Sequence, residues 1–317
     1  MSRVQRVHLD AAAGAEHAGA RVDQAAAALW PDFSRSRLTT WIRAGELRVD
    51  GNAVKPNYRL SPGQRLELDA ALERHDGNPE PEPMQLTVLY ADDDILIVDK
   101  PAGLVVHPGS GNPTGTLVNG LLHLDPNLET LPRAGLVHRL DKDTSGCLVV
   151  ARTPRAHRNL VAALKRREIH RHYLALVRGR VIAGGRVDAP LGRHPVDRRR
   201  QVVRADGRPA ITRYRVARRL AGATLLDVEL ETGRTHQIRV HMQHAGFPLV
   251  GDPVYGRRGS PAGLDEDQRT AWRSFPRQAL HAARLELAHP ITGGCVSVSA
   301  PMPDDMAALI EILDESA

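Results

Sequence analysis

Apolar and polar residues repeat with two different periods along the chain, and both halves of the chain therefore predict helices and strands. In residues 22–29 and 33–42 the apolar positions have the spacing of short amphipathic helices. The second helix is expected to end at Gly45, because glycine readily adopts the left-handed conformation that ends helices. Apolar residues then alternate with polar ones in 47–49 and 66–68, which predicts two strands. Together these elements predict a small α/β unit of about 60 residues.

Residues 71–85, ALERHDGNPEPEPMQ, differ in composition from the chain on either side. They contain three prolines and a cluster of acids, and almost nothing that could enter a hydrophobic core. Such a segment is typical of a solvated linker between domains. We therefore divide the chain into an N-terminal extension at 1–18, a small domain at 19–70, the linker at 71–85 and a large domain at 86–317.

The large domain combines short apolar runs with helical segments. The runs ILIVDK, CLVVAR, YLALVRG and LLDVELETG predict strands, and residues 153–167 have a helical pattern. Because helices do not regularly separate the strands, we expect an α+β fold with a largely antiparallel mixed sheet, not a doubly wound parallel one. The chain is expected to end in a helix that starts at 303–305 and buries Met306 and Leu309.

Composition and charge limit the class of protein. The chain has 317 residues, 42% of them hydrophobic, and a net charge of +6, which fits a globular protein with an anionic partner. Its two cysteines rule out a disulfide framework. The sequence has no apolar run of the length and composition that would predict a membrane span or an export signal. We therefore expect a cytoplasmic protein that does not bind a membrane.

The positive charge is concentrated between Arg193 and Arg219. This segment holds ten arginines and only two acids, and it includes the run Arg198, Arg199 and Arg200. Arginine can bind two phosphate oxygens with its planar guanidinium group, so the segment favours a nucleic acid as partner. A solvated surface loop is the other interpretation of such a run.

The densest polar motif of the chain is HRLDKDTSG at residues 138–146. It lies between an apolar entry and an expected strand at 147–150, so its side chains belong to a loop held by rigid structure. Reactive groups commonly occupy such loops, and Asp141 is the candidate nucleophile. An aspartate in this position is also a common turn cap, and the motif by itself does not decide between the two roles.

Two further segments offer partners for Asp141. In ETGRTHQIRVHMQHAG we expect a helix that Thr235 caps and Gly246 ends, with Arg239 as a fixed cation. In YLALVRG, Tyr173 starts a strand and has a ring able to press on a flat ligand, although a half-buried core position fits it equally. A guanidinium beside a carboxylate favours the ionised form, which is the form that attacks as a nucleophile. The three residues are far apart in the sequence, so their proximity is an assumption.

The order of elements in the small domain, with the segment SRSRLTTWIRAGELRVDGNAVKPNYRLSPGQRLEL, resembles the S4 RNA-binding domain over about residues 19–70. In that family the second helix and the following turn face RNA. The resemblance therefore implies RNA phosphates near four basic side chains, each of which also fits an ordinary solvated charge. These side chains are Arg35, Arg37, Arg43 and Lys55.

Six segments are similar, in this order, to motifs of the A family of ribosomal large-subunit pseudouridine synthases: KPAGLVVHPG, HRLDKDTSG, YLALVRG, GRTHQIRVHM, PLVGDPVYG and RQALHAARLELAHP. With the S4-like domain, the similarity extends over nearly the whole chain and is closest to the bacterial D-type members. It implies isomerisation of uridine in RNA to pseudouridine, without cofactor or metal. In this reaction the C1′–N1 bond breaks, the uracil turns, and the sugar is rejoined at C5.

The resemblance also implies roles for single residues. Asp141 matches the aspartate that attacks the nucleoside, and Arg239 matches the arginine that pairs with this carboxylate. Tyr173 matches the tyrosine that packs on the target base and takes part in proton removal at C5. Arg139 matches a residue that enters the RNA stack where the target nucleotide leaves. The D-type members imply uridines of the helix 69 stem-loop in bacterial large-subunit (23S) ribosomal RNA as the substrate.

Other interpretations stay open at this point. The same chemistry fits other ribosomal RNA sites or tRNA. A non-catalytic S4-type factor of ribosome assembly would use the basic residues alone, and a hydrolase would use Asp141 and Asp143 as paired acid and base. We expect no metal site, since His236, His241 and His244 have no Asp, Glu or Cys ligands beside them. The expected state is a monomer bound to ribosomal RNA or to a pre-ribosomal particle.

Overall fold

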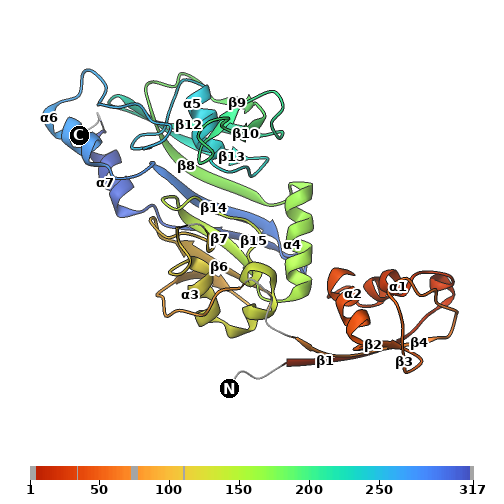
Figure 1. Cartoon of the computed structure of the whole chain (residues 1–317). Coiled ribbons are helices and arrows are strands. Elements are labelled where there is room, and N and C mark those ends of the chain that lie inside the picture. The colour runs from red at the N-terminus through yellow and green to blue at the C-terminus, as the bar shows by residue number, and fades with distance from the viewer. Residues whose placement is uncertain (1–4, 34, 73–77, 110, 315–317) are drawn as a thin grey trace.

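The computed structural model describes residues 5–33, 35–72, 78–109 and 111–314 (Figure 1). Within these ranges the chain forms a small α/β part up to residue 72 and a large part from residue 78, which contains a long twisted sheet. No helix in these ranges is long and apolar enough to cross a membrane.

The small part is a four-stranded antiparallel sheet with the strand order β1, β4, β2, β3, on which helices α1 and α2 pack. The helices and strands expected between residues 22 and 68 are confirmed. Helix α2 ends before Gly45, whose φ is 75°. The bounds are β1 Gln5–Ala12, α1 Val22–Leu29, α2 Arg35–Ala44, β2 Leu47–Val49, β3 Asn52–Ala53 and β4 Arg65–Leu72.

The pairing of β1 revises the N-terminal boundary that we drew from the sequence. This strand lies inside the expected extension 1–18, yet all of it pairs with β4, from Gln5 opposite Leu72 to Ala12 opposite Arg65. Its alternate residues Val7, Leu9 and Ala11 pack against the core of the small part. The period of two was present in the sequence, but its partner strand lies more than 50 residues away. Because β4 continues to Leu72, the linker also begins later than residue 71.

The described end of the linker, from residue 78, packs on the large part and is not simply solvated. The Asn78 amide donates to the carbonyl oxygens of Glu129 and Leu131, at 3.0 and 2.9 Å. The Glu82 carboxylate accepts from the backbone N–H of Gly115 at 3.0 Å. Polar side chains can attach a segment to a domain by bonding to its backbone, and the sequence does not show which backbone groups are available.

The large part is built on a nine-stranded sheet in the order β5, β6, β7, β14, β8, β13, β12, β9, with β15 also paired to β14. Only β7 and β14 pair in parallel among the described strands, so the expected largely antiparallel mixed sheet is confirmed. The strands are β5 Thr87–Ala91, β6 Ile95–Lys100, β7 Ser145–Ala151, β8 His170–Arg178, β9 Gly185–Asp188, β12 Ile211–Leu220, β13 Ala223–Leu230, β14 Leu280–Ala288 and β15 Cys295–Ser299.

The sheet is covered on both faces, which explains why its inner strands are continuously apolar. In β6, Leu96 and Val98 pack in a cluster with helix α3 (Leu117–Leu124), whereas Ile95 and Ile97 pack in another cluster with helix α4 (Pro154–Arg166). Strands buried on both faces lose the alternation of polar and apolar residues. The run ILIVDK, predicted as a strand, is thus an interior strand of the sheet, between β5 and β7.

The remaining elements lie around this sheet (Figure 1). The terminal helix α7 buries Met306 and Leu309 in a cluster with α6, as predicted. The bounds are α3 Leu117–Leu124, α4 Pro154–Arg166, α5 Gln237–His244, α6 Glu266–Ser274, α7 Asp304–Ile312, the short hairpin β10 Leu191–Arg193 and β11 Gln201–Val203, and the 3-10 helices Pro126–Thr130 and Pro132–Gly135. A further 3-10 helix, Ala15–His17, belongs to the small part.

Candidate active site

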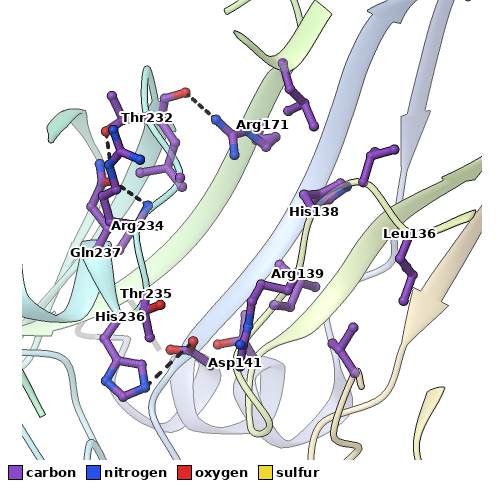
Figure 2. Close-up of a pocket in the computed structure, with 18 of the residues that line it drawn as sticks. Leu136, His138, Arg139, Asp141, Arg171, Thr232, Arg234, Thr235, His236 and Gln237 are labelled. Carbon is purple, nitrogen blue, oxygen red and sulfur yellow. Dashed lines mark hydrogen bonds and ion pairs between the residues drawn. The ribbon is translucent and has the colours of Figure 1, made fainter. Parts of the chain in front are cut away.

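A cavity of about 990 Å³ lies in the large part, where the loop before β7 meets strand β8 and the start of helix α5. Its walls come mainly from five separate stretches of sequence, at 105–109, 136–141, 161–167, 171–173 and 230–239. Figure 2 shows Asp141, Arg139 and His236 together at one end of the cavity. The sequence motifs HRLDKDTSG and ETGRTHQIRVHM therefore line one cavity.

The loop that carries Asp141 is held by buried groups bonded to its backbone. The ammonium group of Lys100 is fully buried and donates to the Lys142 carbonyl at 2.8 Å. The Arg277 guanidinium donates to the Asp143 carbonyl at 3.2 Å. The N–H of Thr144 closes the turn on the Asp141 carbonyl at 3.1 Å. These bonds leave the Asp141 side chain pointing into the cavity on a fixed backbone, with 16% of its surface exposed.

Arg239, on helix α5, binds Asp141 directly. Its Nη1 donates to Oδ2 of Asp141 at 3.0 Å, and its Nε and Nη2 bind both carboxylate oxygens of Asp252 at 2.7 and 2.9 Å. Burial lowers the pKa of Arg239, but the hydrogen bonds and charges of Asp252 and Asp141 outweigh burial and raise it overall. The guanidinium is therefore a permanent cation, and the structure brings together the carboxylate and arginine whose proximity was only assumed.

Asp252 is a site residue that the sequence reasoning missed. Its side chain is fully buried, and its Oδ1 also accepts the backbone N–H groups of Val254 and Tyr255 at 2.9 and 3.0 Å. Burial raises the pKa of Asp252, but the bonds from Arg239 outweigh burial and lower it overall. The sequence signal was the motif PLVGDPVYG, which contains Asp252 and was noted for its family resemblance alone. In the structure, Gly251 before it has a φ of 69°, and a Cβ there would meet the Arg277 carbonyl at 2.1 Å.

Tyr173 and Arg139 also line the cavity, in different ways. Tyr173 is buried at the start of β8, and burial raises the pKa of its hydroxyl, which is therefore protonated at neutral pH. Arg139 is exposed on the loop beside Asp141. An exposed guanidinium at the cavity wall is available to RNA, so the role implied for Arg139 is sterically possible.

Helix α5 starts differently from the prediction. His236, with a φ of 55°, is its N-cap, and helical geometry begins at Gln237, so Thr235 is not the cap. The His236 Nε2 lies 3.9 Å from Oδ1 of Asp141, beyond hydrogen-bonding distance, and burial lowers the pKa of this histidine. A neutral His236 beside the carboxylate leaves Arg239 as its ion-pair partner in the described chain.

The geometry disfavours two of the alternatives. Asp143 is not among the residues that line the cavity, so it does not form an acid–base pair with Asp141 there. Of the three histidines considered as metal ligands, His241 has one nitrogen 2.8 Å from the Thr212 hydroxyl and the other 2.9 Å from the Ala189 carbonyl. Both nitrogens are thus occupied within the fold.

The described residues contain one other group of metal-ligand type, Asp92, Asp94 and His289. The Asp92 carboxylate already accepts from the Tyr90 hydroxyl at 2.6 Å, from His289 at 3.0 Å and from two backbone N–H groups at 2.8 Å. These bonds account for its position as the cap of the turn between β5 and β6.

Two of the basic residues expected to face RNA in the small part have partners within the fold. Arg35 binds the buried Asp23 carboxylate through Nε and Nη2, at 3.2 and 2.8 Å. Arg37 donates to the Thr130 carbonyl of the large part at 2.9 Å, and burial lowers its pKa. Arg37 therefore connects the two parts of the chain, a role that the S4 pattern does not reveal.

The other basic candidates are mostly exposed. Exposed side chains belong to Arg43, Lys55, Arg198 and Arg199. Arg200 instead is half-buried and lies over the ring of Tyr255, with 5.6 Å between its guanidinium carbon and the ring centroid. The hairpin between β10 and β11 thus offers two exposed arginines and is attached to the active site through a third.

Comparison of the chain with known proteins shows the family to which it belongs. A family model described as RNA pseudouridylate synthase matches residues 94–244, and an S4 domain model matches residues 21–66. The ribosomal large subunit pseudouridine synthase D of Xanthomonas campestris pv. campestris is 51% identical to the chain, over 95% of the chain and 91% of that relative. The chain belongs to the RNA pseudouridylate synthase family.

Other members of the RNA pseudouridylate synthase family agree with this assignment. The ribosomal large subunit pseudouridine synthase D of Escherichia coli K12 is 48% identical over 98% of the chain and 95% of that relative. The solved structure of human RNA pseudouridylate synthase domain containing 1 is 27% identical and covers 74% of this chain and 91% of its own, with a TM-score of 0.55. The enzyme class and the S4 domain predicted from the sequence are therefore confirmed.

Proposed function

We propose that the protein isomerises uridine to pseudouridine in bacterial 23S ribosomal RNA, with Asp141 as the catalytic nucleophile. The observation that carries this proposal is the buried chain of contacts from Asp252 through Arg239 to Asp141 at the wall of the cavity. A permanent cation fixes one oxygen of Asp141, and the carboxylate is aimed at the space where a nucleoside would lie.

The reaction requires the uridine to leave the RNA stack. A uridine within a helix or loop hides its glycosidic bond, and turning it out of the stack costs a few kcal/mol. The cavity of about 990 Å³ is large enough for a nucleoside, and the exposed Arg139 beside it can occupy the space that the uridine vacates. Phosphate contacts from the basic hairpin and from the S4 domain offset the cost.

Within the cavity, the roles divide among three side chains. Asp141 attacks the nucleoside or removes a sugar proton, and both steps need its ionised form. The C1′–N1 bond breaks, the uracil turns against the ring of Tyr173, and the C1′–C5 bond forms as Asp141 is released. The proton on C5 is then lost to solvent, and N1 takes up a proton in its place. Arg239 holds Asp141 in this orientation throughout by its hydrogen bond to Oδ2. The isomerisation is redox-neutral, and no step in it consumes a cofactor or requires a metal.

The relatives support a finer assignment of the substrate. Both bacterial relatives are called ribosomal large subunit pseudouridine synthase D, which supports ribosomal RNA of the large subunit as the substrate. We assign the target to the helix 69 stem-loop, presented as ribosomal RNA or in a pre-ribosomal particle to a cytoplasmic monomer. Mapping of pseudouridines in total RNA with and without the gene tests this assignment. Loss of pseudouridine only from tRNA, or only from other ribosomal positions, would reject it.

Asp141→Asn tests the chemistry. This variant is expected to release no tritium from RNA that contains C5-labelled uridine, while binding the same RNA nearly as tightly as wild type. Asp143→Asn is the matched control, because it removes a neighbouring carboxylate that does not line the cavity, and it should keep most of the activity. Tritium release by Asp141→Asn at the wild-type rate would reject the nucleophile.

A further inference from the structure

Four Lys and Arg side chains are buried in the described part of the chain, and three of them make several short hydrogen bonds. Arg239 binds two carboxylates. Arg277 binds both oxygens of Asp305, at 2.7 Å each. Lys100 donates to three backbone carbonyl oxygens at 2.7 to 2.9 Å. The fourth buried cation is Arg171.

Arg171 has an incomplete set of partners within the described ranges. The residue is only 8% exposed, yet its one hydrogen bond runs from Nη2 to the Leu230 carbonyl, at a long 3.4 Å. Its Nε is buried without a partner, and none of the described carboxylates forms an ion pair with it. A buried cation without a counter-charge is unfavourable unless a ligand supplies the missing partner.

The position of Arg171 relates it to the substrate. It precedes Tyr173 by two residues on strand β8, so both side chains lie on the same face, about 7 Å apart along the strand. Both line the cavity, and Figure 2 shows Arg171 at the end opposite Asp141. A nucleotide whose base lies on Tyr173 therefore has its backbone within reach of Arg171.

The surroundings leave space for this guanidinium. A Cβ at Gly233 would lie 2.5 Å from Nη1 of Arg171, so any larger residue there would displace the group. Gly233 belongs to the same motif, GRTHQIRVHM, that provides Arg239. The motif thus provides Arg239 itself, and the missing side chain of Gly233 leaves room for the guanidinium of Arg171.

His138 adds a second unpaired donor to the same wall. Its Nε2 accepts the backbone N–H of Val149 at 3.2 Å, and burial together with the charge of Arg171 lowers its pKa to about 3. The ring is therefore neutral and carries its proton on Nδ1, which is buried without a partner in the described chain. The cavity wall thus holds two buried N–H donors without acceptors, Nε of Arg171 and Nδ1 of His138, and an acceptor on the substrate would satisfy them.

We infer that Arg171 binds a backbone phosphate of the everted nucleotide and so positions the uridine over Asp141. The inference rests on the proposed RNA substrate. A phosphate provides the negative charge that the buried guanidinium lacks, and it can accept two hydrogen bonds from the planar group. Arg171 is then a substrate-binding residue, and the energy of pairing it is gained only when the RNA is bound.

Phosphate replacement in the RNA tests this pairing. Stem-loop RNAs carry a single neutral methylphosphonate at successive positions around the uridine proposed as the target, and the dissociation constant of each is measured. Wild type should lose about ten-fold in affinity at one phosphate adjacent to that uridine, since a lost ionic contact is worth about that factor. Arg171→Gln should bind the unmodified RNA about ten-fold more weakly and lose nothing further at that position.

The control and the second variant separate the possible outcomes. Arg166→Gln removes an exposed charge that pairs with Glu168 and does not line the cavity, so it should keep the wild-type pattern. Gly233→Ala keeps the charge of Arg171 but displaces its guanidinium. This second variant should show the pattern expected for Arg171→Gln, and it provides the test if Arg171→Gln folds poorly. Arg171→Gln should also melt no lower than wild type, because it removes an unpaired buried charge.

Equal sensitivity of Arg171→Gln and wild type at every methylphosphonate position would overturn the inference. So would a large fall in melting temperature of Arg171→Gln together with a wild-type pattern for Gly233→Ala, because Arg171 would then be structural. Binding is measured whether or not turnover occurs. Failure of the wild type to form pseudouridine would therefore count against the proposed function and not against the phosphate contact.

Discussion

The substitution Asp252→Asn tests whether the buried Asp252 positions the catalytic Asp141 through Arg239. Asp252 does not line the cavity, but its two oxygens hold the Nε and Nη2 groups of Arg239 at 2.7 and 2.9 Å, and this arginine holds Asp141 at 3.0 Å. Asparagine has nearly the same shape. Its oxygen can still accept the backbone N–H groups of Val254 and Tyr255, so the change removes the negative charge and replaces the acceptor of the Arg239 Nε–H group with an amide donor.

The expected magnitude follows from these contacts. Breaking a buried ion pair costs about 3 to 5 kcal/mol of stability. Arg239 keeps Asp141 as a second carboxylate, so we expect the lower end, about 3 kcal/mol. Without Asp252 the guanidinium is free to turn and bind both oxygens of Asp141, which withdraws the nucleophile from the substrate. A loss of about 100-fold in kcat, equivalent to about 2.7 kcal/mol in the activation barrier, is expected.

Two measurements check this prediction. Urea unfolding gives the change in stability, and tritium release at saturating RNA gives kcat. Asp125→Asn is the matched control, because Asp125 pairs with Arg152 at 2.9 Å and is nearly as buried, but neither residue lines the cavity. The control should lose stability and keep kcat. Wild-type kcat in Asp252→Asn, or an equal loss in both variants, would refute the argument that Asp252 positions Asp141 through Arg239.

Two further predictions concern pH and the S4 domain. The pKa of His138 is about 3 in the folded protein and its ordinary value is 6.5, so the unfolded chain binds one more proton between these pH values. The free energy of unfolding should therefore fall as pH decreases from 6.5 towards 3, and fall less steeply in His138→Gln; parallel urea-unfolding curves against pH would contradict this. Removal of residues 1–76, which keeps Asn78 and its bonds to the large part, should weaken binding of structured RNA at physiological salt more than it lowers kcat at saturating RNA. An unchanged dissociation constant would count against an RNA-binding role of the S4 domain.

The sequence by itself determined the local structure of most of the chain. Helix α2 ends at Gly45 and helix α7 buries the predicted stripe, because helical periodicity and end signals act within a few residues. The loop with Asp141 was also visible, since a dense polar motif between apolar segments needs no long-range information. Motifs shared with a known family supplied the chemistry that local patterns leave open.

Only the tertiary structure decided which distant residues share an environment. The contact of Arg239 with Asp141 spans 98 positions. The buried ion pair of Asp252 with Arg239, and the burial of Arg171 without a counter-charge, likewise arise only when the chain folds. The role of strand β1 was missed for the same reason: its alternation of apolar and polar residues identifies a strand of the sheet only through its pairing with β4, at the other end of the small part. Periodicity reports which face of an element is apolar, whereas burial and charge pairing depend on the elements that pack against that face.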